Sequence, residues 1–210
     1  AEADARLGAM VAFAPVERGE AVRGYLEQLH GYPLVKGVRR LVLSDPADFC
    51  ARSDYVRGVQ LLADYGLSFD ICLRHEQLPS ALRLVERCPQ VAFILDHLGK
   101  PDIKGGRMQP WQDNITALAQ HPNVVCKVSG AVSNADKEHW KREDLRPYID
   151  HVVTAFGVDR VLFGSDWPVL TLAAHYGEWM DALDWATADW SDDERDRLFF
   201  RNAQAFYRLA

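Results

Sequence analysis

The stretch Val91-Ala92-Phe93-Ile94-Leu95-Asp96-His97-Leu98 joins an almost uninterrupted apolar run to two neighbouring ionisable residues. Apolar runs without polar alternation are typical of parallel strands that are covered on both faces. The carboxyl ends of such strands are where α/β proteins usually carry their catalytic groups. The stretch therefore predicts a buried parallel strand, with Asp96 and His97 at the end where a site would form.

Five more apolar runs of this kind occur along the chain. They cover Gly8–Val16, Val35–Leu43, Leu67–Arg74, Val124–Gly130 and Arg160–Asp166. Successive runs start 27, 32, 24, 33 and 36 residues apart, close to the ~30 residues of a strand-helix-strand unit. Helical spacing of apolar residues predicts helices over Ala47–Tyr65 and Leu145–Phe156, and a capping box at Ser191 and Glu194 predicts a third. The pattern predicts an α/β fold.

The composition excludes several classes of protein. The 210 residues are 48% apolar and 26% charged, with a net charge of −6. This is ordinary for a globular chain, and the acidic balance disfavours binding to nucleic acid or to an anionic membrane. No stretch approaches the roughly 20 apolar residues of a membrane span. The N-terminal segment lacks a signal peptide's apolar run, and four cysteines without a Cys-x-x-Cys pair favour buried thiols and a cytoplasmic location.

Polar residues follow five consecutive apolar runs. They are Arg39 and Arg40, then Arg74, His75 and Glu76, then Asp96 and His97, then Lys127 and Ser129, and finally Ser165, Asp166 and Trp167. Ionisable groups at the mouth of an apolar barrel are costly to desolvate unless they are paired or used. The set therefore predicts a site at the carboxyl ends of the strands.

Strand parity separates the two residues at the end of the first stretch. In a regular strand His97 shares a face with residues 93 and 95, whereas Asp96 points the other way. A neutral imidazole can polarise a carbonyl group, accept a proton or bind a metal. Asp166 ends the last run, where it is placed as a general base toward water. The alternatives are an ordinary core histidine and a cap or turn aspartate, so the residues alone indicate a hydrolytic or lyase site.

Several motifs together resemble a known family. They are Asp96-His97-Leu98-Gly99-Lys100-Pro101, Cys126-Lys127-Val128-Ser129-Gly130 and Phe163-Gly164-Ser165-Asp166-Trp167-Pro168, with Lys36-Gly37-Val38-Arg39-Arg40 and Asn202-Ala203-Gln204-Ala205-Phe206-Tyr207 in support. The chain resembles the amidohydrolase-2 branch of the metal-dependent hydrolase superfamily from about Gly8 to Leu209. Within that branch it looks most like the sugar-lactone hydrolases, L-fuconolactonase and L-rhamnonolactonase, and pyrone-dicarboxylate lactonase.

The resemblance implies a TIM-type (β/α)8 barrel and an enzyme that opens cyclic esters with activated water. Asp166 would activate the water and later protonate the leaving oxygen, and His97 would polarise the lactone carbonyl or contact a metal. Arg39 would bind substrate oxygens or a carboxylate, which suits a planar guanidinium. Asp96 would be structural and aimed away from the interior. The further substrate-binding wall residues would be Arg74, His75, Lys127 and Trp167.

One family feature is missing from the sequence. The family's first strand carries a His-x-His pair, and no such pair occurs here. By this comparison Gly8–Val16 is the third barrel strand, so residues 1–210 would form one barrel-related domain of strands three to eight, without the first two strand-helix units. His97 and Asp166 would then form an incomplete metal site. We expect one zinc-like divalent ion, weakly bound or absent, and no organic cofactor.

The main functional prediction is a hydrolase of carbohydrate metabolism that opens a sugar-acid lactone. The alternatives are a decarboxylase of the same superfamily and a truncated, inactive fragment. The expected partner is a small-molecule lactone or sugar acid, with no nucleic acid and no membrane. Open barrel edges would also permit a homo-oligomer.

Overall fold

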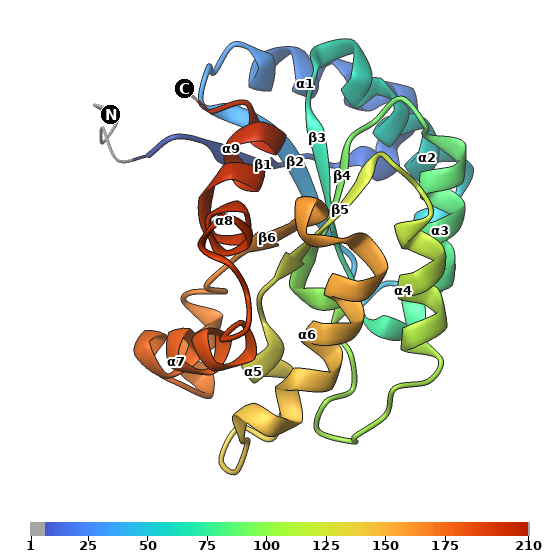
Figure 1. Ribbon diagram of the computed structural model, residues 1–210. Coiled ribbons are helices and arrows are strands. Elements are labelled where there is room, and N and C mark those ends of the chain that lie inside the picture. The colour runs from blue at the N-terminus through green and yellow to red at the C-terminus, as the bar shows by residue number, and fades with distance from the viewer. Residues whose placement is uncertain (1–6, 210) are drawn as a thin grey trace.

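The computed structural model describes residues 7–209 and places six strands of that segment in one sheet (Figure 1). The strands are β1 (Met10–Phe13), β2 (Val35–Leu41), β3 (Ser68–Cys72), β4 (Phe93–Leu95), β5 (Val124–Val128) and β6 (Val161–Phe163). They pair in chain order, and every pair is parallel. The predicted α/β fold with a parallel sheet is confirmed, and each predicted run contains one strand. That two strand-helix units are missing stays a prediction.

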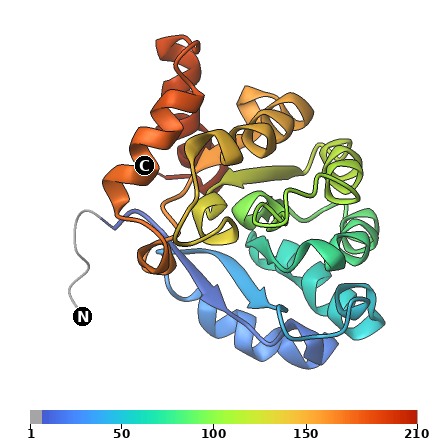
Figure 2. The same cartoon turned by 90° about the horizontal axis from the view of Figure 1, so that it is seen from below.

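Helices connect the strands and lie around the outside of the curved sheet (Figure 2). They are α1 (Arg23–His30), α2 (Ser53–Gln60), α3 (Leu78–Arg87), α4 (Trp111–Ala119), α5 (Ala131–Asn134), α6 (Arg142–Phe156), α7 (Tyr176–Ala186), α8 (Asp192–Asp196) and α9 (Asn202–Tyr207). Short 3-10 turns cover Val16–Val22, Phe49–Ala51, Leu61–Tyr65, His75–Gln77, Asp96–Gly99, Val158–Arg160 and Val169–Leu172, and a π turn covers Arg197–Arg201. The face of the sheet that these helices do not cover points toward the interior of the molecule.

The predicted helices are present with changed limits. The helix predicted over Ala47–Tyr65 is wrong in part, because α2 occupies only its middle and 3-10 turns flank it on both sides. The helix predicted over Leu145–Phe156 lies within α6. The capping box at Ser191 is confirmed, since the Ser191 hydroxyl accepts a hydrogen bond from the Glu194 backbone N–H. The predicted start of a helix is therefore accurate where a capping residue marks it.

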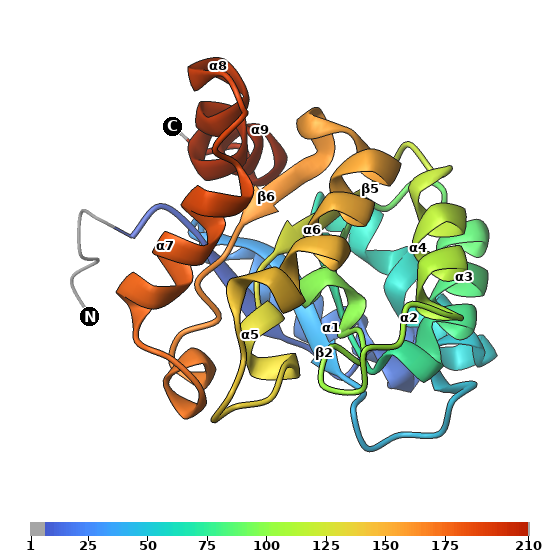
Figure 3. The same ribbon diagram turned by 60° about the horizontal axis from the view of Figure 1, so that its bottom comes forward.

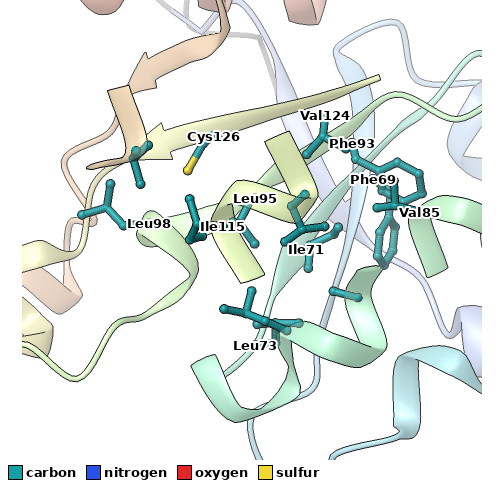
Figure 4. Packing of buried hydrophobic residues seen from close by; sticks show 14 of the residues in the cluster. Phe69, Ile71, Leu73, Val85, Phe93, Leu95, Leu98, Ile115, Val124 and Cys126 are labelled. Carbon is teal, nitrogen blue, oxygen red and sulfur yellow. The ribbon is translucent and has the colours of Figure 1, made fainter. Parts of the chain in front are cut away.

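Each strand divides its side chains between two faces. Phe69 of β3 and Phe93 of β4 face the helices, where their rings meet edge to face with centroids 6.2 Å apart (Figure 4). Alternation along the strands turns Asp70 and Asp96 to the opposite, inner face. The helix-side face is apolar over β3, β4 and β5, whereas β2 adds Arg40 to it beside Ile71, and the inner face carries charged groups at strand level. The carboxyl ends of the strands lie at the end of the sheet where α5 is seen (Figure 3).

The cysteines follow the prediction made from their spacing. Cys50, Cys72, Cys88 and Cys126 are all buried and free. Within residues 7–209, no helix combines the length and the apolar character needed to cross a membrane.

A glycine brings α2 close to the turn that follows β1. A Cβ atom at Gly58 would lie 1.9 Å from the carbonyl oxygen of Val16, far inside the normal contact distance. Only glycine permits this approach, which lets α2 cover the first strands of the sheet.

We expect Gly58→Ala to lower the free energy of unfolding by about 1–3 kcal/mol, because the added methyl group forces the helix and the Val16 backbone apart. The matched control is Gly24→Ala in α1, where nothing lies within 4 Å of the added carbon. That change should leave stability unaltered or raise it by up to about 1 kcal/mol. Urea denaturation measures both variants, and equal stabilities would contradict the close contact.

Candidate active site

A cavity of about 420 Å³ lies at the carboxyl ends of the strands. Five of the seven residues predicted for the site line it, namely Arg39, His97, Lys127, Asp166 and Trp167. They come from the ends of β2, β4, β5 and β6, or from the residues that follow. The structure therefore brings together groups that lie as far apart as 128 residues in the chain.

The other two predicted residues lie in a neighbouring cavity. Arg74 and His75 line a hollow of about 630 Å³, which shares Lys100 with the first cavity. β3 ends at Cys72, and the 3-10 turn over His75–Gln77 carries these side chains away from His97. His75 Nδ1 instead lies 3.1 Å from the carbonyl oxygen of Lys100. Contact of Arg74 and His75 with substrate stays a prediction.

His97 is aimed into the cavity by an unusual turn. β4 ends at Leu95, and His97 has φ +56°, a left-handed conformation that is uncommon for a residue with a side chain. Its Nε2 atom lies 3.4 Å from Asp166 Oδ1, and its Nδ1 atom lies 2.9 Å from Ser129 Oγ. Burial lowers the pKa of His97 despite the opposing charges of Asp96 and Asp166. The imidazole is therefore kept neutral near pH 7.

Asp166 also occupies a left-handed position, with φ +58°. Its side chain is 7% exposed, and the Ser133 hydroxyl donates to Asp166 Oδ2 at 3.0 Å. One carboxylate oxygen thus faces His97 and the other is held by Ser133. Non-glycine residues in this conformation concentrate at functional sites, where the surrounding structure maintains the strain.

Two glycines allow the ends of β4, β5 and β6 to meet closely. A Cβ atom at Gly130 would lie 2.7 Å from His97 Cβ, and one at Gly164 would lie 2.9 Å from Ser129 Cβ. Both distances are shorter than real Cβ contacts. The small residues after β5 and β6 therefore make room for the His97–Ser129 contact.

The expected orientation of Asp96 is wrong. Asp96 Oδ2 accepts a hydrogen bond from Arg39 at 3.2 Å, and Asp96 Oδ1 lies 2.8 Å from Lys127 Nζ. Parity does place Asp96 opposite residues 93 and 95, but those residues face the helices, so Asp96 faces the interior. His97 also reaches the cavity, because its left-handed backbone turns the side chain away from the direction that regular strand alternation would give it.

Lys127 is the centre of a buried charge network on the inner face of the sheet. Its ammonium donates to Asp70 Oδ2 at 2.5 Å and contacts Asp96 on the other side. The Tyr207 hydroxyl of α9 donates to the same Asp70 oxygen at 3.2 Å. Both carboxylate side chains are at most 1% exposed. Buried charges of opposite sign are thereby paired across β3, β4 and β5.

Charge and burial compete in this network. Burial opposes the charged form of Lys127, but the carboxylates of Asp70 and Asp96 outweigh it and raise the pKa of the ammonium. Burial likewise opposes ionisation of Asp96, yet Lys127, His97 and Arg39 lower its pKa. For Asp70 burial prevails and raises the pKa. Lys127 is therefore held in its charged form.

Four contributing residues escaped prediction from the sequence. They are Asp70, Ser133, Tyr207 and Lys100. A signal existed for Asp70, because it is an acidic residue inside the apolar run Leu67–Arg74. Lys100 and Tyr207 lie within two of the motifs that resemble the family, but nothing in those motifs assigned them to the site. Ser133 carries no such signal, since α5 is placed over the site only by the fold.

His97 and Asp166 lie close enough together to bind the same divalent metal ion. Two ligand atoms of a tetrahedral zinc site lie about 3.3 Å apart. His97 Nε2 and Asp166 Oδ1 lie 3.4 Å apart, which is close to that spacing. Cys72, Asp96 and His97 also offer atoms within 4.8 Å of one another. However, burial raises the pKa of the Cys72 thiol to about 12, and Asp96 is paired. Residues 7–209 thus supply two well-placed ligands, fewer than the three of a catalytic zinc site.

Comparisons with known proteins agree with this arrangement. The family model of the amidohydrolases matches residues 1–209. The L-fucono-1,5-lactonase of Burkholderia ambifaria is 35% identical over 183 residues, which cover 84% of this chain and 62% of that protein. The chain spans 52% to 64% of the length of this and two further curated relatives.

Solved structures share the fold. A crystal structure of an amidohydrolase from Burkholderia multivorans with bound HEPES is 30% identical, with a TM-score of 0.90, and covers 99% of this chain and 76% of that chain. A second crystal form has the same TM-score and contains zinc. A 2,6-dihydroxybenzoate decarboxylase is 16% identical with a TM-score of 0.62, covers 96% of this chain and 71% of its own, and shares the fold alone. Because the family model spans nearly the whole chain, this protein belongs to the amidohydrolase family.

Proposed function

We propose that this protein hydrolyses the cyclic ester of a sugar-acid lactone, and that the reaction takes place in this cavity. The observation that carries this proposal is the contact between a neutral His97 and Asp166 inside a cavity that Arg39 also lines. Relatives named as sugar lactonases at 35% identity favour this reaction over decarboxylation, for which the similarity is to the fold alone.

Asp166 is the proposed general base. Its carboxylate accepts a proton from a water molecule as that water attacks the lactone carbonyl carbon. The ring C–O bond then breaks, and the leaving oxygen takes the proton back from Asp166. Water is thus added across the ester, and the product is the open hydroxy acid. Ser133 holds Asp166 Oδ2, which leaves Oδ1 beside His97 and the cavity.

His97 is the proposed electrophile. When Ser129 donates its hydroxyl proton to Nδ1, the proton of the neutral ring resides on Nε2. This N–H can then donate to the lactone carbonyl oxygen as negative charge develops there. Burial, which lowers the pKa of His97, keeps the ring in the form that this role requires.

Arg39 is the proposed substrate-binding residue. Its side chain is 41% exposed and lines the cavity, and within residues 7–209 one of its terminal nitrogens is bound, to Asp96. The rest of the guanidinium is free to bind hydroxyl or carboxylate oxygens of the substrate. Trp167, which is 69% exposed at the rim, would provide an apolar wall. Lys127 would orient Asp96 and Arg39 and contribute positive charge beneath the substrate.

A divalent ion would be held by Asp166 and by His97 in its other neutral tautomer, in which Nδ1–H donates to Ser129 Oγ and Nε2 carries no proton. Such an ion would polarise the lactone carbonyl and lower the pKa of bound water. The spacing of the two ligand atoms and the zinc-containing amidohydrolase structure support this proposal. With two ligands from the described residues, we propose weak rather than tight binding.

We also propose that β1 to β6 correspond to strands three to eight of a (β/α)8 barrel. The chain order of the six parallel strands and the TM-score of 0.90 to a longer amidohydrolase support this correspondence. Residues 1–210 would then form one barrel-related unit.

Asp166→Asn should reduce lactone hydrolysis by about 10²–10⁴-fold, because the amide cannot accept the proton from water. The matched control is Asp189→Asn, which makes the same change at an exposed residue outside the cavity and should leave the rate unchanged. Acid release from a panel of aldonolactones measures both variants. Retention of most of the rate in Asp166→Asn, with the fold intact by circular dichroism, would refute the assignment of the base.

Arg39→Ala should raise KM at least as much as it lowers kcat, because the guanidinium is proposed to bind the substrate in both the ground state and the transition state. Steady-state kinetics on the best lactone of the panel gives both constants. A change confined to kcat would contradict this role and indicate stabilisation of the transition state alone.

Zinc binding should depend on the two proposed ligands. We expect calorimetric titration to give one site that a chelator empties, and His97→Ala or Asp166→Asn to weaken it by at least about tenfold. His30→Ala, at an exposed histidine of α1, should leave the affinity unchanged. Equal zinc affinity in all the variants would place the ion elsewhere.

A further inference from the structure

The backbone around both proposed catalytic residues is held in a conformation that side chains disfavour. Four consecutive residues, from His97 to Lys100, have φ between +50° and +68°. Asp166 has φ +58°. Such residues persist only where surrounding contacts over-determine them, and the contacts here can be identified.

The first contact comes from α4. Trp111 is the first residue of that helix and is 1% exposed. Its indole N–H donates to the carbonyl oxygen of Leu98 at 2.7 Å, one residue after His97. The Leu98 side chain is itself fully buried, in the same apolar cluster as Ile115 of α4 (Figure 4). No water can therefore replace this donor easily, because the surroundings are apolar.

The second contact comes from α7 and repeats the first. Trp179 is also 1% exposed, and its indole N–H donates to the carbonyl oxygen of Gly164 at 3.0 Å. Gly164 lies two residues before Asp166, and its own N–H donates to the Val128 carbonyl at 3.1 Å. Both sides of the backbone that leads into Asp166 are thus fixed by hydrogen bonds.

We propose that Trp111 and Trp179 are positioning residues, which fix the backbones of His97 and Asp166 through their indole N–H groups. This inference rests on the proposed function for its kinetic consequence. If either N–H is removed, a buried carbonyl loses its partner, and the peptide rotates toward another donor. That rotation would carry His97 or Asp166 away from the 3.4 Å contact. Displacements of about 1 Å can cost about 100-fold in rate.

A third tryptophan provides the matched control. The Trp140 indole N–H donates to the carbonyl oxygen of Ala173 at 3.1 Å. This is the same kind of bond, but Ala173 does not adjoin either proposed catalytic residue. Loss of the bond at Trp140 therefore measures what an indole hydrogen bond contributes to the fold alone.

The experiment compares Trp111→Phe, Trp179→Phe and Trp140→Phe at a temperature where circular dichroism shows all three to be folded. We expect kcat to fall about 10- to 100-fold in the first two variants, with KM within about twofold of the original. Trp140→Phe should leave both constants within about twofold. Unchanged kcat in folded Trp111→Phe and Trp179→Phe would overturn the proposal, as would an equal loss in Trp140→Phe.

A second replacement separates the N–H group from the bulk of the ring. Benzothienylalanine, introduced at position 111 or 179 of the full chain, keeps the shape of the indole but has sulfur in place of N–H. It serves where a phenylalanine variant fails to fold. The same fall in kcat is expected, and full activity would show that ring packing alone is required.

A measurement that does not depend on catalysis tests the positioning role separately from the proposed lactone hydrolysis. The imidazole signals of His97, assigned by their loss in His97→Gln, are followed by nitrogen-15 NMR. They should shift in Trp111→Phe and stay in place in Trp140→Phe. If the original protein opens no lactone, the proposed function fails, and the NMR comparison still decides the positioning role. Unchanged His97 signals in Trp111→Phe would overturn it.

Discussion

The interior of this protein depends on the Lys127 ammonium, which is held between two buried carboxylates. Asp70 of β3 and Asp96 at the end of β4 face each other across it. Without this cation, buried Asp70 would lose its ion-pair partner and Asp96 would keep only Arg39, and an unpaired buried carboxylate is far more costly than the pair itself. Asp96 in turn binds Arg39 of β2. One positive charge on β5 thus fixes the side of the cavity where the substrate is proposed to bind.

Much of the fold and part of the site could be predicted because they follow from simple patterns. Six apolar runs at regular intervals require parallel strands, since only covered strands tolerate such composition. Groups at the carboxyl ends of parallel strands converge, which predicts that His97 and Asp166 share one site. These inferences needed no knowledge of loop conformation.

The remainder of the site depends on backbone conformation that has no clear sequence signal. The expected direction of Asp96 failed because residues 93 and 95 face the helices, so strand alternation turns Asp96 inward. His97 reaches the cavity through its left-handed backbone, which a rule for regular strands does not anticipate. Arg74 and His75 line the neighbouring cavity for a similar reason, since Arg74 caps a 3-10 turn that begins at His75, three residues after the end of β3. Where a short strand ends in a turn, the turn rather than the strand sets the direction of the following side chains.

The bond between Tyr207 and Asp70 joins residues 137 positions apart in the sequence. Loop closure over such a distance is slow, because its entropic cost must be met before the contact stabilises the chain. During synthesis β3 and β5 emerge long before α9, so Asp70 can pair with Lys127 while it still lacks the hydroxyl of Tyr207. We therefore expect the inner face of the sheet to reach its final electrostatic state only after α9 docks.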